Sequence, residues 1–250
     1  MADRSHAPYS FVWWILAVCV ASWVVPVLAA DQESPVVPVI GSSTEPPPGA
    51  VVLFDGTSLD NWITRDGRPA PWPIEDGAMC SRGGDIGCVE TYTDALIHIE
   101  FRVPDMPNAS GQGKGNSGIF INGRYELQVL DSFGFESPGK GDCGALYSAH
   151  APLVNACTPP GQWQTFDIVF RAARRDDAGN KVENARFTVF QNGVLIHNNV
   201  ELSGVLPGAI DDREGEPGPL FLQDHGCDVR YRNIWLVHLP AKGSDTYEPH

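Results

Sequence analysis

Short runs of apolar and β-branched residues recur along the chain from residue 51 onwards, separated by glycine, proline, asparagine and aspartate. The clearest run spans residues 95–103, where Ile97, Ile99 and Phe101 alternate with polar residues. A period of two is the pattern of a β-strand that buries one face. No window of a dozen residues shows a period of 3.6, so we expect many strands and few, short helices.

The turn residues between these runs predict how the strands connect. Asn192-Gly193 lies between two apolar runs and is a strong signal for a two-residue β-hairpin turn. Many short antiparallel strands predict an all-β protein, an antiparallel β-sandwich of the jelly-roll type. The expected strands span residues 51–54, 62–64, 78–81, 86–91, 95–103, 117–122, 124–131, 144–148, 163–171, 184–191, 193–198, 219–225 and 229–238.

The N-terminal region differs in composition from the rest. Residues 11–28 are almost wholly apolar, and the small residues Ala29 and Ala30 follow them. This pattern predicts a signal peptide over residues 1–30 and export to a periplasmic or extracellular space. The alternative is an uncleaved membrane anchor, because the apolar run is just long enough to span a bilayer. With cleavage, we expect no stable membrane insertion.

Composition divides the remaining chain. Residues 31–50 are rich in proline, serine and glutamate and predict an extended linker. Residues 51–240 suffice for one β-sandwich domain, and residues 241–250 form a tail. The formal net charge of −14 argues against nucleic acid and anionic membranes as partners, because both repel an acidic protein.

Five cysteines follow the predicted signal peptide: Cys80, Cys88, Cys143, Cys157 and Cys227. No pair has the C-x-x-C spacing of a zinc site. In an oxidising compartment, Cys80–Cys88 and Cys143–Cys157 are the disulfides we consider, although the sequence does not determine the pairing. An odd count leaves at least one thiol free, and we interpret Cys227 as a small buried residue.

A polar strip follows the expected strand over residues 124–131. Side chains alternate along a strand, so Glu126 and Gln128 share the face opposite Leu127 and Val129. Asp131 lies at the end of the strand. This face could form a polar cleft for a sugar-like ligand, or it could be a solvated outer surface.

A second polar strip follows the expected hairpin over residues 220–235. Gln223 and His225 share one face before the turn at Gly226, and Arg230 and Arg232 share a face after it. If the two strips pack side by side, one pocket holds a carboxylate, an imidazole and a guanidinium. A third polar region, the acidic loop over residues 203–218, we interpret as a solvated excursion.

Eight segments carry a resemblance to a known family. They are Leu53-Phe-Asp-Gly-Thr-Ser-Leu-Asp-Asn-Trp62, Gly115-Asn-Ser-Gly-Ile-Phe120, Tyr125-Glu-Leu-Gln-Val-Leu-Asp-Ser132, Cys143-Gly-Ala-Leu-Tyr147, Trp163-Gln-Thr-Phe-Asp167, Asn192-Gly-Val194, Gly218-Pro-Leu-Phe-Leu-Gln-Asp-His-Gly226 and Val229-Arg-Tyr-Arg-Asn-Ile-Trp235. Through them the chain resembles the 3-keto-disaccharide hydrolase domain family, in order and nearly without gaps, over residues 51–239. The resemblance implies a fold similar to the concanavalin-like jelly roll of β-glucanases, a bacterial exported protein, and cleavage of glycosides oxidised at C3.

The implied reaction needs a base, an acid and a positive group. A ketone at C3 acidifies the C2 hydrogen, so a base gives an enolate that expels the C1 substituent, and water then adds. As hypotheses, His225 or Glu126 is the base, Asp131 or Glu126 is the acid, and Arg232 or a bound cation stabilises the enolate. The side chains expected to bind substrate hydroxyls are Glu100, Asn116, Gln128 and Gln223. The sequence requires no cofactor, although Glu126 and His225 with a third ligand could hold a divalent cation.

Two other functions remain open at this stage. Retaining jelly-roll glucanases carry a Glu-x-Asp-x-x-Glu strand motif, and the stretch from Glu126 to Asp131 departs from it at Gln128. A non-catalytic carbohydrate-binding module would use exposed aromatic residues instead, for example Trp62, Trp72 or Tyr147. All three functions have a carbohydrate as the partner.

Overall fold

The computed structural model describes residues 45–242, and β-strands supply nearly all of its regular structure. One short 3-10 helix, η1 (Gly111–Gly113), is the only helical element in this part of the chain. None of the described helices is long and apolar enough to cross a membrane. The predicted signal peptide and most of the predicted linker lie outside the described residues, so they stay predictions.

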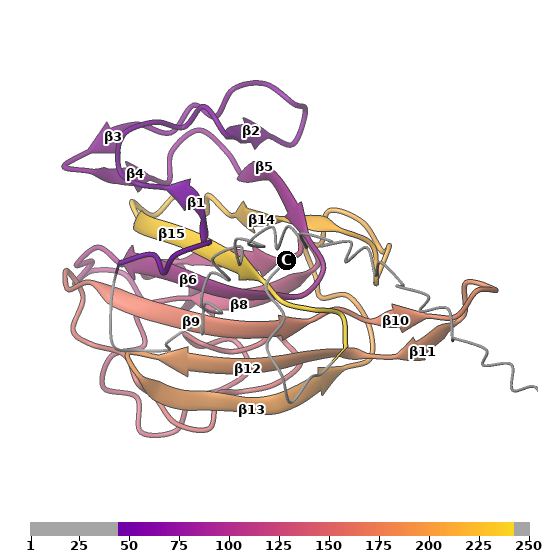
Figure 1. Cartoon of the computed structure of the whole chain (residues 1–250). Helices are drawn as coiled ribbons and strands as arrows, with labels where there is room; N and C mark the ends of the chain where they lie inside the picture. Colours follow the sequence, from indigo (N-terminus) through magenta and orange to yellow (C-terminus); the bar gives the residue numbers. More distant parts are fainter. Residues whose placement is uncertain (1–44, 243–250) are drawn as a thin grey trace, which may run out of the picture. The chain divides into compact units, whose positions relative to one another are not determined.

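The strands form two main antiparallel sheets, which confirms the predicted sandwich (Figure 1). The large sheet contains, in spatial order, β13 (Val194–Leu202), β12 (Ala185–Gln191), β9 (Gln164–Arg171), β6 (Ala95–Arg102), β15 (Arg230–His238), β4 (Ala78–Cys80) and β3 (Ile74–Glu75), and β1 (Val51–Phe54) also pairs with β15. The small sheet contains β2 (Trp62–Thr64), β5 (Ile86–Tyr92), β14 (Gly218–Leu222), β7 (Ser117–Ile121) and β8 (Tyr125–Val129). A separate hairpin pairs β10 (Arg174–Arg175) with β11 (Lys181–Glu183).

The hydrophobic core lies between the two sheets. Tyr125 from the small sheet contacts Phe170 and Phe187 from the large sheet, with ring centroids 5.6 and 5.3 Å apart. Aromatic pairs at this spacing add to the stabilisation from their buried area. Because side chains alternate along each strand, every second residue instead lies on an outer face, and these two outer faces point in opposite directions.

Asn-Gly pairs close two of the hairpins. Asn192 and Gly193 have φ angles of 51° and 78° between β12 and β13, which confirms the predicted turn. Asn122 and Gly123 have φ angles of 54° and 68° between β7 and β8. Positive φ at both central residues matches the right-handed twist of the flanking strands, so both turns fix the register of their hairpins.

Two predicted elements are wrong. Residues 144–148 form no strand, because the segment turns back on itself and Leu146 makes only isolated bridges with Leu127 and His150. The region 220–235 is no hairpin either. Its first half, β14, pairs with β5 and β7, whereas its second half, β15, pairs with strands of the large sheet. The chain therefore changes sheets at residues 223–229. The short strands β3, β10 and β11 were not predicted.

All five cysteines among residues 45–242 are free thiols. The proposed Cys80–Cys88 bridge is wrong, because Cys80 belongs to the large sheet and Cys88 to the small sheet. Cys143 and Cys157, in contrast, converge on one side chain. The Gln191 Nε2 atom lies 3.6 Å from Cys143 Sγ and 3.4 Å from Cys157 Sγ.

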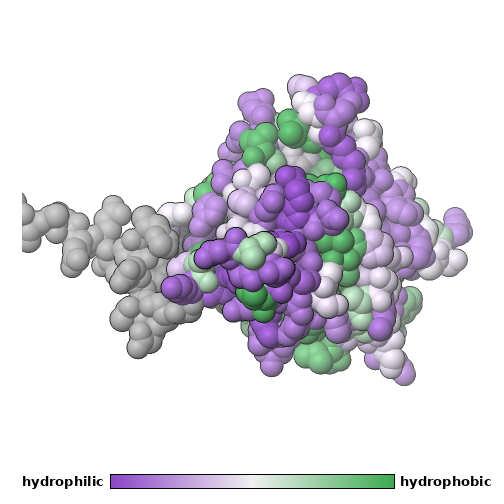
Figure 2. All heavy atoms as spheres, turned by 90° about the vertical axis from the view of Figure 1, so that its right-hand side faces the viewer, coloured by the Kyte–Doolittle hydropathy of each residue, from purple (hydrophilic) through white to green (hydrophobic). Residues whose placement is uncertain are grey.

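Figure 2 shows the side of the protein that carries β10 and β11 at the right of Figure 1. Hydrophilic residues cover most of this face, and hydrophobic residues form small, separate patches. Val182 of β11, 59% exposed, is one of the exposed apolar residues of the domain. Scattered apolar residues of this kind are normal on a protein surface and do not indicate a docking site.

Candidate functional site

The outer face of the small sheet gathers polar side chains from β8 and from residues next to the ends of β2, β5 and β14. The strand register aligns Gly87 with Phe221, Phe221 with Phe120, and Phe120 with Glu126. We call this surface the small-sheet face. It consists of Ile63, Arg65, Asp85, Gly87, Gly118, Phe120, Glu126, Gln128, Phe221 and Gln223.

The first polar strip and the part of the second strip that precedes Gly226 meet on this face. β7 lies between β8 and β14, and the Gln223 N–H donates to the carbonyl of Gly118 at 2.9 Å. Gly118 is also the register partner of Gln128. Glu126, Gln128 and Gln223 therefore lie on one surface, as the sequence predicted.

The Glu126 carboxylate has no partner within residues 45–242. It reaches back over Gly118, where a side chain would collide with Oε1, and Glu126 is only 5% exposed. Among the described residues, neither hydrogen bonds nor ion pairs involve this carboxylate. Burial, and to a smaller extent the negative charge of Asp85, raise the pKa of Glu126 to about 7. A carboxylate with such a pKa can both accept and release a proton near neutral pH.

Three amides lie beside Glu126. Gln128 Nε2 donates to Gln112 Oε1 at 3.1 Å and to Asn116 Oδ1 at 3.2 Å, and Asn116 Nδ2 donates to the Gln112 carbonyl at 2.8 Å. The remaining acceptor, Gln128 Oε1, is buried and has no hydrogen-bond partner among the described residues. An orphaned buried acceptor costs free energy unless a donor such as a ligand hydroxyl satisfies it.

The cation of this face is Arg65, which the sequence analysis missed. Its Nε donates to Asp85 Oδ2 at 3.2 Å, and its guanidinium carbon lies 4.5 Å from the centroid of the Phe221 ring. Another nitrogen of the group donates to the Gly208 carbonyl at 3.2 Å. Side-chain alternation within residues 63–65 and 85–87 puts Arg65 and Asp85 on the outer face of their strands. This becomes informative only once β2 is known to pair with β5. Gln112 lies in a glycine-rich loop, where no strand pattern could identify it.

His225 lies in the turn that follows β14 and is exposed. It makes no hydrogen bond or ion pair with residues 45–242. Its neighbour Asp224 fixes this turn, because the carboxylate accepts hydrogen bonds from the backbone N–H groups of Gly83, Gly84 and Gly226 at 2.8 to 3.0 Å. His225 thus lies two residues beyond Gln223 with its side chain exposed, and its predicted role as the base is not tested by these contacts.

Asp131 does not join Glu126. Its carboxylate lies 2.9 Å from Lys114 Nζ and accepts a hydrogen bond from the Phe133 N–H at 3.3 Å. Five residues of extended strand, about 16 Å, separate the two acids. Asp131 therefore stabilises the loops at the end of β8, and neither the predicted acid nor the carboxylate pair of a retaining glucanase is assembled from these two residues.

Arg232 and Glu100 lie on the outer face of the large sheet, on the opposite side of the sandwich. Arg232 Nε donates to Glu100 Oε2 at 2.6 Å, and Asn233 Nδ2 donates to Glu100 Oε1 at 2.9 Å. An irregular register around Asn233, whose φ is 46°, directs both side chains to Glu100. The prediction that Arg232 and Glu100 share a pocket with Glu126 is wrong, because the chain changes sheets between Gln223 and Arg230.

The cluster around Glu100 on the large sheet is a network of ion pairs. His98 Nδ1 lies 2.7 Å from Asp167 Oδ1, and the His98 ring stacks on Trp235 with centroids 5.0 Å apart. Burial opposes protonation of His98, but hydrogen bonds to Asp167 and Glu100 raise its pKa to about 9. Burial likewise opposes ionisation of Glu100, whereas hydrogen bonds from His98, Asn233 and Arg232 lower its pKa to about 2. Every charge therefore has an opposite charge beside it.

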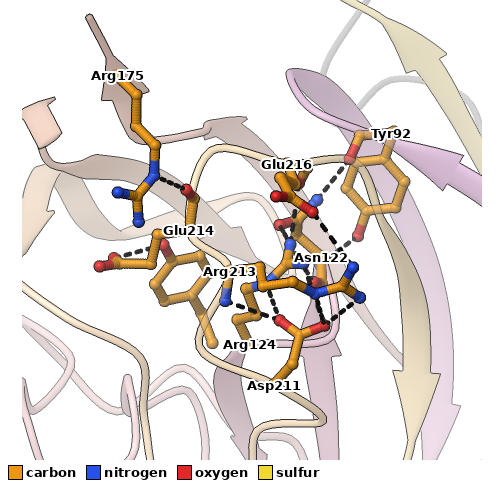
Figure 3. A network of polar contacts seen from close by, with 9 residues as sticks. Tyr92, Asn122, Arg124, Arg175, Asp211, Arg213, Glu214 and Glu216 are labelled. Atoms are coloured by element: carbon orange, nitrogen blue, oxygen red, sulfur yellow. Dashed lines mark hydrogen bonds and ion pairs between the residues drawn. The ribbon is translucent and has the colours of Figure 1, made fainter. Parts of the chain in front are cut away.

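The acidic loop over residues 203–217 is no solvated excursion, and that interpretation is wrong. Arg124, fully buried at the end of the β7–β8 hairpin, donates from Nε to Asp211 Oδ1 at 2.6 Å and from Nη1 to the Glu216 carbonyl at 2.9 Å (Figure 3). Glu214 accepts a hydrogen bond from the Tyr125 hydroxyl at 2.8 Å. These contacts hold the loop over the edge of the small-sheet face, where Gly208 packs on Phe120.

Two further sequence expectations concern ligands. Trp62 and Trp72 are 1% and 3% exposed, so these two cannot be the sugar platforms of a binding module. Within residues 45–242, no group of three or more His, Cys, Asp or Glu side chains is placed to bind a metal ion. The structure of residues 45–242 therefore offers no third His, Cys, Asp or Glu ligand for a divalent cation bound by Glu126 and His225.

A jelly-roll sandwich with amides, carboxylates and one guanidinium on one face suits the binding of a carbohydrate, and the family match below supplies the class, a carbohydrate-active protein that cleaves glycosides. Residues 49–237 match the family model described as the 3-keto-alpha-glucoside-1,2-lyase-like domain, and the chain belongs to this family. The search of curated proteins found no match.

Solved structures agree with this assignment. A crystal structure of a candidate glycosyl hydrolase from Parabacteroides distasonis is 36% identical, covers 77% of this chain and 85% of that chain, and gives a TM-score of 0.71. Two further structures of candidate glycosyl hydrolases from the same organism are 21% and 19% identical, with TM-scores of 0.56 and 0.52. They cover 77% and 76% of this chain and 94% and 99% of their own chains, and they show the fold alone.

Proposed function

We propose that the protein cleaves glycosides whose sugar carries a ketone at C3, and that Glu126 is the base. The observation that carries this proposal is the Glu126 carboxylate, which is buried, unpaired within residues 45–242 and has a pKa of about 7. An acid used only for stability would have an ion-pair or hydrogen-bond partner. The description of the family supports the substrate class.

In the proposed reaction, Glu126 removes the proton from C2, next to the ketone. The electron pair forms an enolate, which expels the oxygen substituent from C1, and addition of water to the unsaturated product completes hydrolysis. Each step conserves electrons without an oxidant or reductant. The amides of Gln112, Asn116 and Gln128 would bind sugar hydroxyls, with Gln128 Oε1 as the free acceptor.

The positive group near the developing charge is then Arg65, because Arg232 lies on the other side of the sandwich. Asp85 holds Arg65 and also raises the pKa of Glu126. His225 is exposed and one turn from this face, and it is the group we propose for protonating the leaving oxygen. A metal ion is not needed to write these steps.

The test is a comparison of Glu126→Gln with the wild type on 3-keto-trehalose, measured as release of free sugar. We expect kcat to fall by about a thousandfold, within the range for loss of a general base. Glu183→Gln, an exposed glutamate on β11, is the matched control and should keep full activity. Normal turnover by Glu126→Gln would remove Glu126 from the mechanism, and binding without release by the wild type would favour a carbohydrate-binding module.

The pH dependence gives an independent prediction. Because the base must be ionised, kcat/KM should rise tenfold per pH unit below about pH 7 and level off above it. Asp85→Asn removes one cause of the raised pKa and should shift this limb to lower pH. If the rise of kcat/KM with pH occurs at the same pH in Asp85→Asn as in the wild type, a group other than Glu126 controls the pH dependence.

A further inference from the structure

A pocket of about 270 Å³ opens on the small-sheet face, next to the proposed catalytic groups. Ile63 and Arg65 line it at the end of β2, Gly87 on β5, and Pro219 and Phe221 on β14. Ile210, from the anchored loop, completes the lining. None of these side chains has a role in the proton transfer described above except Arg65.

Two contacts shape the pocket. The Phe221 ring packs directly on Gly87, where a Cβ atom would lie 2.8 Å from Cδ2 of Phe221, so this ring forms the floor. The loop that carries Ile210 is held beside the sheet, because the Ile210 N–H donates to the Gly123 carbonyl at 2.9 Å and Asp211 is bound by Arg124. The floor and one wall are therefore fixed by contacts within the protein.

The apolar side chains of the lining favour an apolar group over a sugar ring. A sugar presents hydroxyls around its rim, and each needs a hydrogen-bond partner when it is buried. Of the lining side chains, Thr64 already donates to Asp66 Oδ1 at 2.5 Å, and the rest are apolar apart from Arg65. A flat aromatic ring needs no such partners and stacks well on a guanidinium such as that of Arg65.

The size of the pocket also fits one ring. A cavity of about 150 Å³ is known to hold benzene, so this volume accepts a substituted benzene ring.

Arg65 connects the pocket with Glu126. Its guanidinium lies above the Phe221 ring at 4.5 Å, and the same group donates to Asp85, whose charge acts on Glu126. The Glu126 carboxylate over Gly118 is one strand spacing, about 5 Å, from β14. A C1 substituent of a sugar bound beside Glu126 can reach the pocket past Arg65.

We propose that this pocket binds the aglycone, and that the preferred substrates are 3-keto-glycosides of aromatic alcohols. The inference rests on the proposed function. In the elimination, the C2 proton passes to Glu126, the C1–O bond breaks, and its electron pair stays on the departing phenolic oxygen. The Arg65 guanidinium stabilises that oxyanion, and a proton from solvent or His225 gives the free phenol.

The test compares two substrates, the 3-keto forms of phenyl glucoside and methyl glucoside, in variants of the pocket. Gly87→Val displaces the Phe221 ring that forms the floor of the pocket, and we expect kcat/KM for the phenyl substrate to fall at least tenfold while the methyl substrate changes less than twofold. Ile63→Trp fills the pocket from its rim without touching the strand interior, and it should give the same pattern if Gly87→Val folds poorly. Val89→Ile, on the same face of β5 but outside the pocket, is the control.

Binding without turnover supplies the second measurement. Unoxidised phenyl glucoside carries no ketone, so titration calorimetry reports its affinity alone, and the two pocket variants should weaken it at least tenfold. Equal losses for both substrates, or no loss for either, would overturn the aglycone assignment even if Glu126→Gln is inactive. Full activity of Glu126→Gln would instead overturn the proposed function, so the two failures are distinguishable.

Discussion

The position of Glu126 is unfavourable for the stability of the folded protein. Its carboxylate is buried above Gly118, and no other described residue neutralises it. Burial of an ionisable group disfavours its charged form, and the nearby charge of Asp85 adds to that cost. The protein keeps a costly group where the sheet leaves space for a ligand, which is common for catalytic residues.

This cost gives a prediction about stability. The pKa of Glu126 is about 7 in the folded protein, above its ordinary value of 4.5, so the folded state binds the proton more tightly. Stability should therefore decrease as the pH rises from about 4.5 to 7 through this group. Glu126→Gln removes the effect and should be more stable than the wild type at about pH 8, by up to roughly 3 kcal/mol.

Urea denaturation at about pH 8 and pH 4 measures this difference. Near pH 4, where the carboxyl group is protonated in both states, the variant and the wild type should be nearly equal. A variant that is less stable than the wild type at about pH 8 would contradict the view that Glu126 is an uncompensated charge.

At the scale of elements, the loop over residues 203–217 shapes the site. This loop carries several acidic residues, and contacts with the buried Arg124 hold it in place beside the small-sheet face. Arg124 forms a two-point contact with Asp211, and hydrogen bonds from Arg124 and Arg213 lower the pKa of Asp211 to about 2, although burial opposes this (Figure 3). Charge patterns along the sequence cannot reveal this, because the partner lies far away in the chain.

Replacing Arg124 should therefore release the loop. Arg124→Met leaves Asp211 with Arg213 as its remaining cationic partner, and the lost buried hydrogen bonds should cost about 1 to 3 kcal/mol. Trypsin should then cleave after Arg213 faster than in the wild type, and denaturation should show the loss of stability. Glu216→Gln removes only the exposed ion pair with Arg213 and should change stability by less than about 1 kcal/mol. Unchanged cleavage in Arg124→Met would show that other contacts hold the loop.

At the scale of the whole molecule, the sandwich brings segments distant in sequence together. Cys143 and Cys157 meet on Gln191, which lies on β12 of the large sheet. The thiol of Cys143 donates to the sulfur of Cys157, which raises the pKa of Cys143 and lowers that of Cys157. A sulfur with a lowered pKa attacks a disulfide more readily, so this pair is prepared for oxidation.

We expect oxidised glutathione to convert Cys143 and Cys157 into a disulfide. Thiol titration of the unfolded protein should show two fewer thiols, and unfolding should require about 3 kcal/mol more, since the crosslink restricts a loop of about 15 residues in the unfolded chain. Cys143→Ser should abolish both effects. Loss of thiols without a gain in stability would show that the crosslink strains the fold.

The sequence by itself determined the local features. The alternation of apolar and polar residues located most strands and put Glu126 and Gln128 on one face, because side-chain direction in a strand depends only on position along it. The Asn192-Gly193 turn followed from the conformations these two residues tolerate. The family motifs also marked the residues from Gly115 to Ser132 and from Gly218 to Gly226 that surround the site.

Only the tertiary structure decided which faces meet. The change of sheets between Gln223 and Arg230 carries Arg232 to the far side of the sandwich, and the pairing of β2 with β5 brings Arg65 to Glu126's side. Sheet membership depends on contacts between residues far apart in the chain, which a period of two does not encode. The carboxylate, the amides and the guanidinium therefore became one site only when the strands were ordered in space.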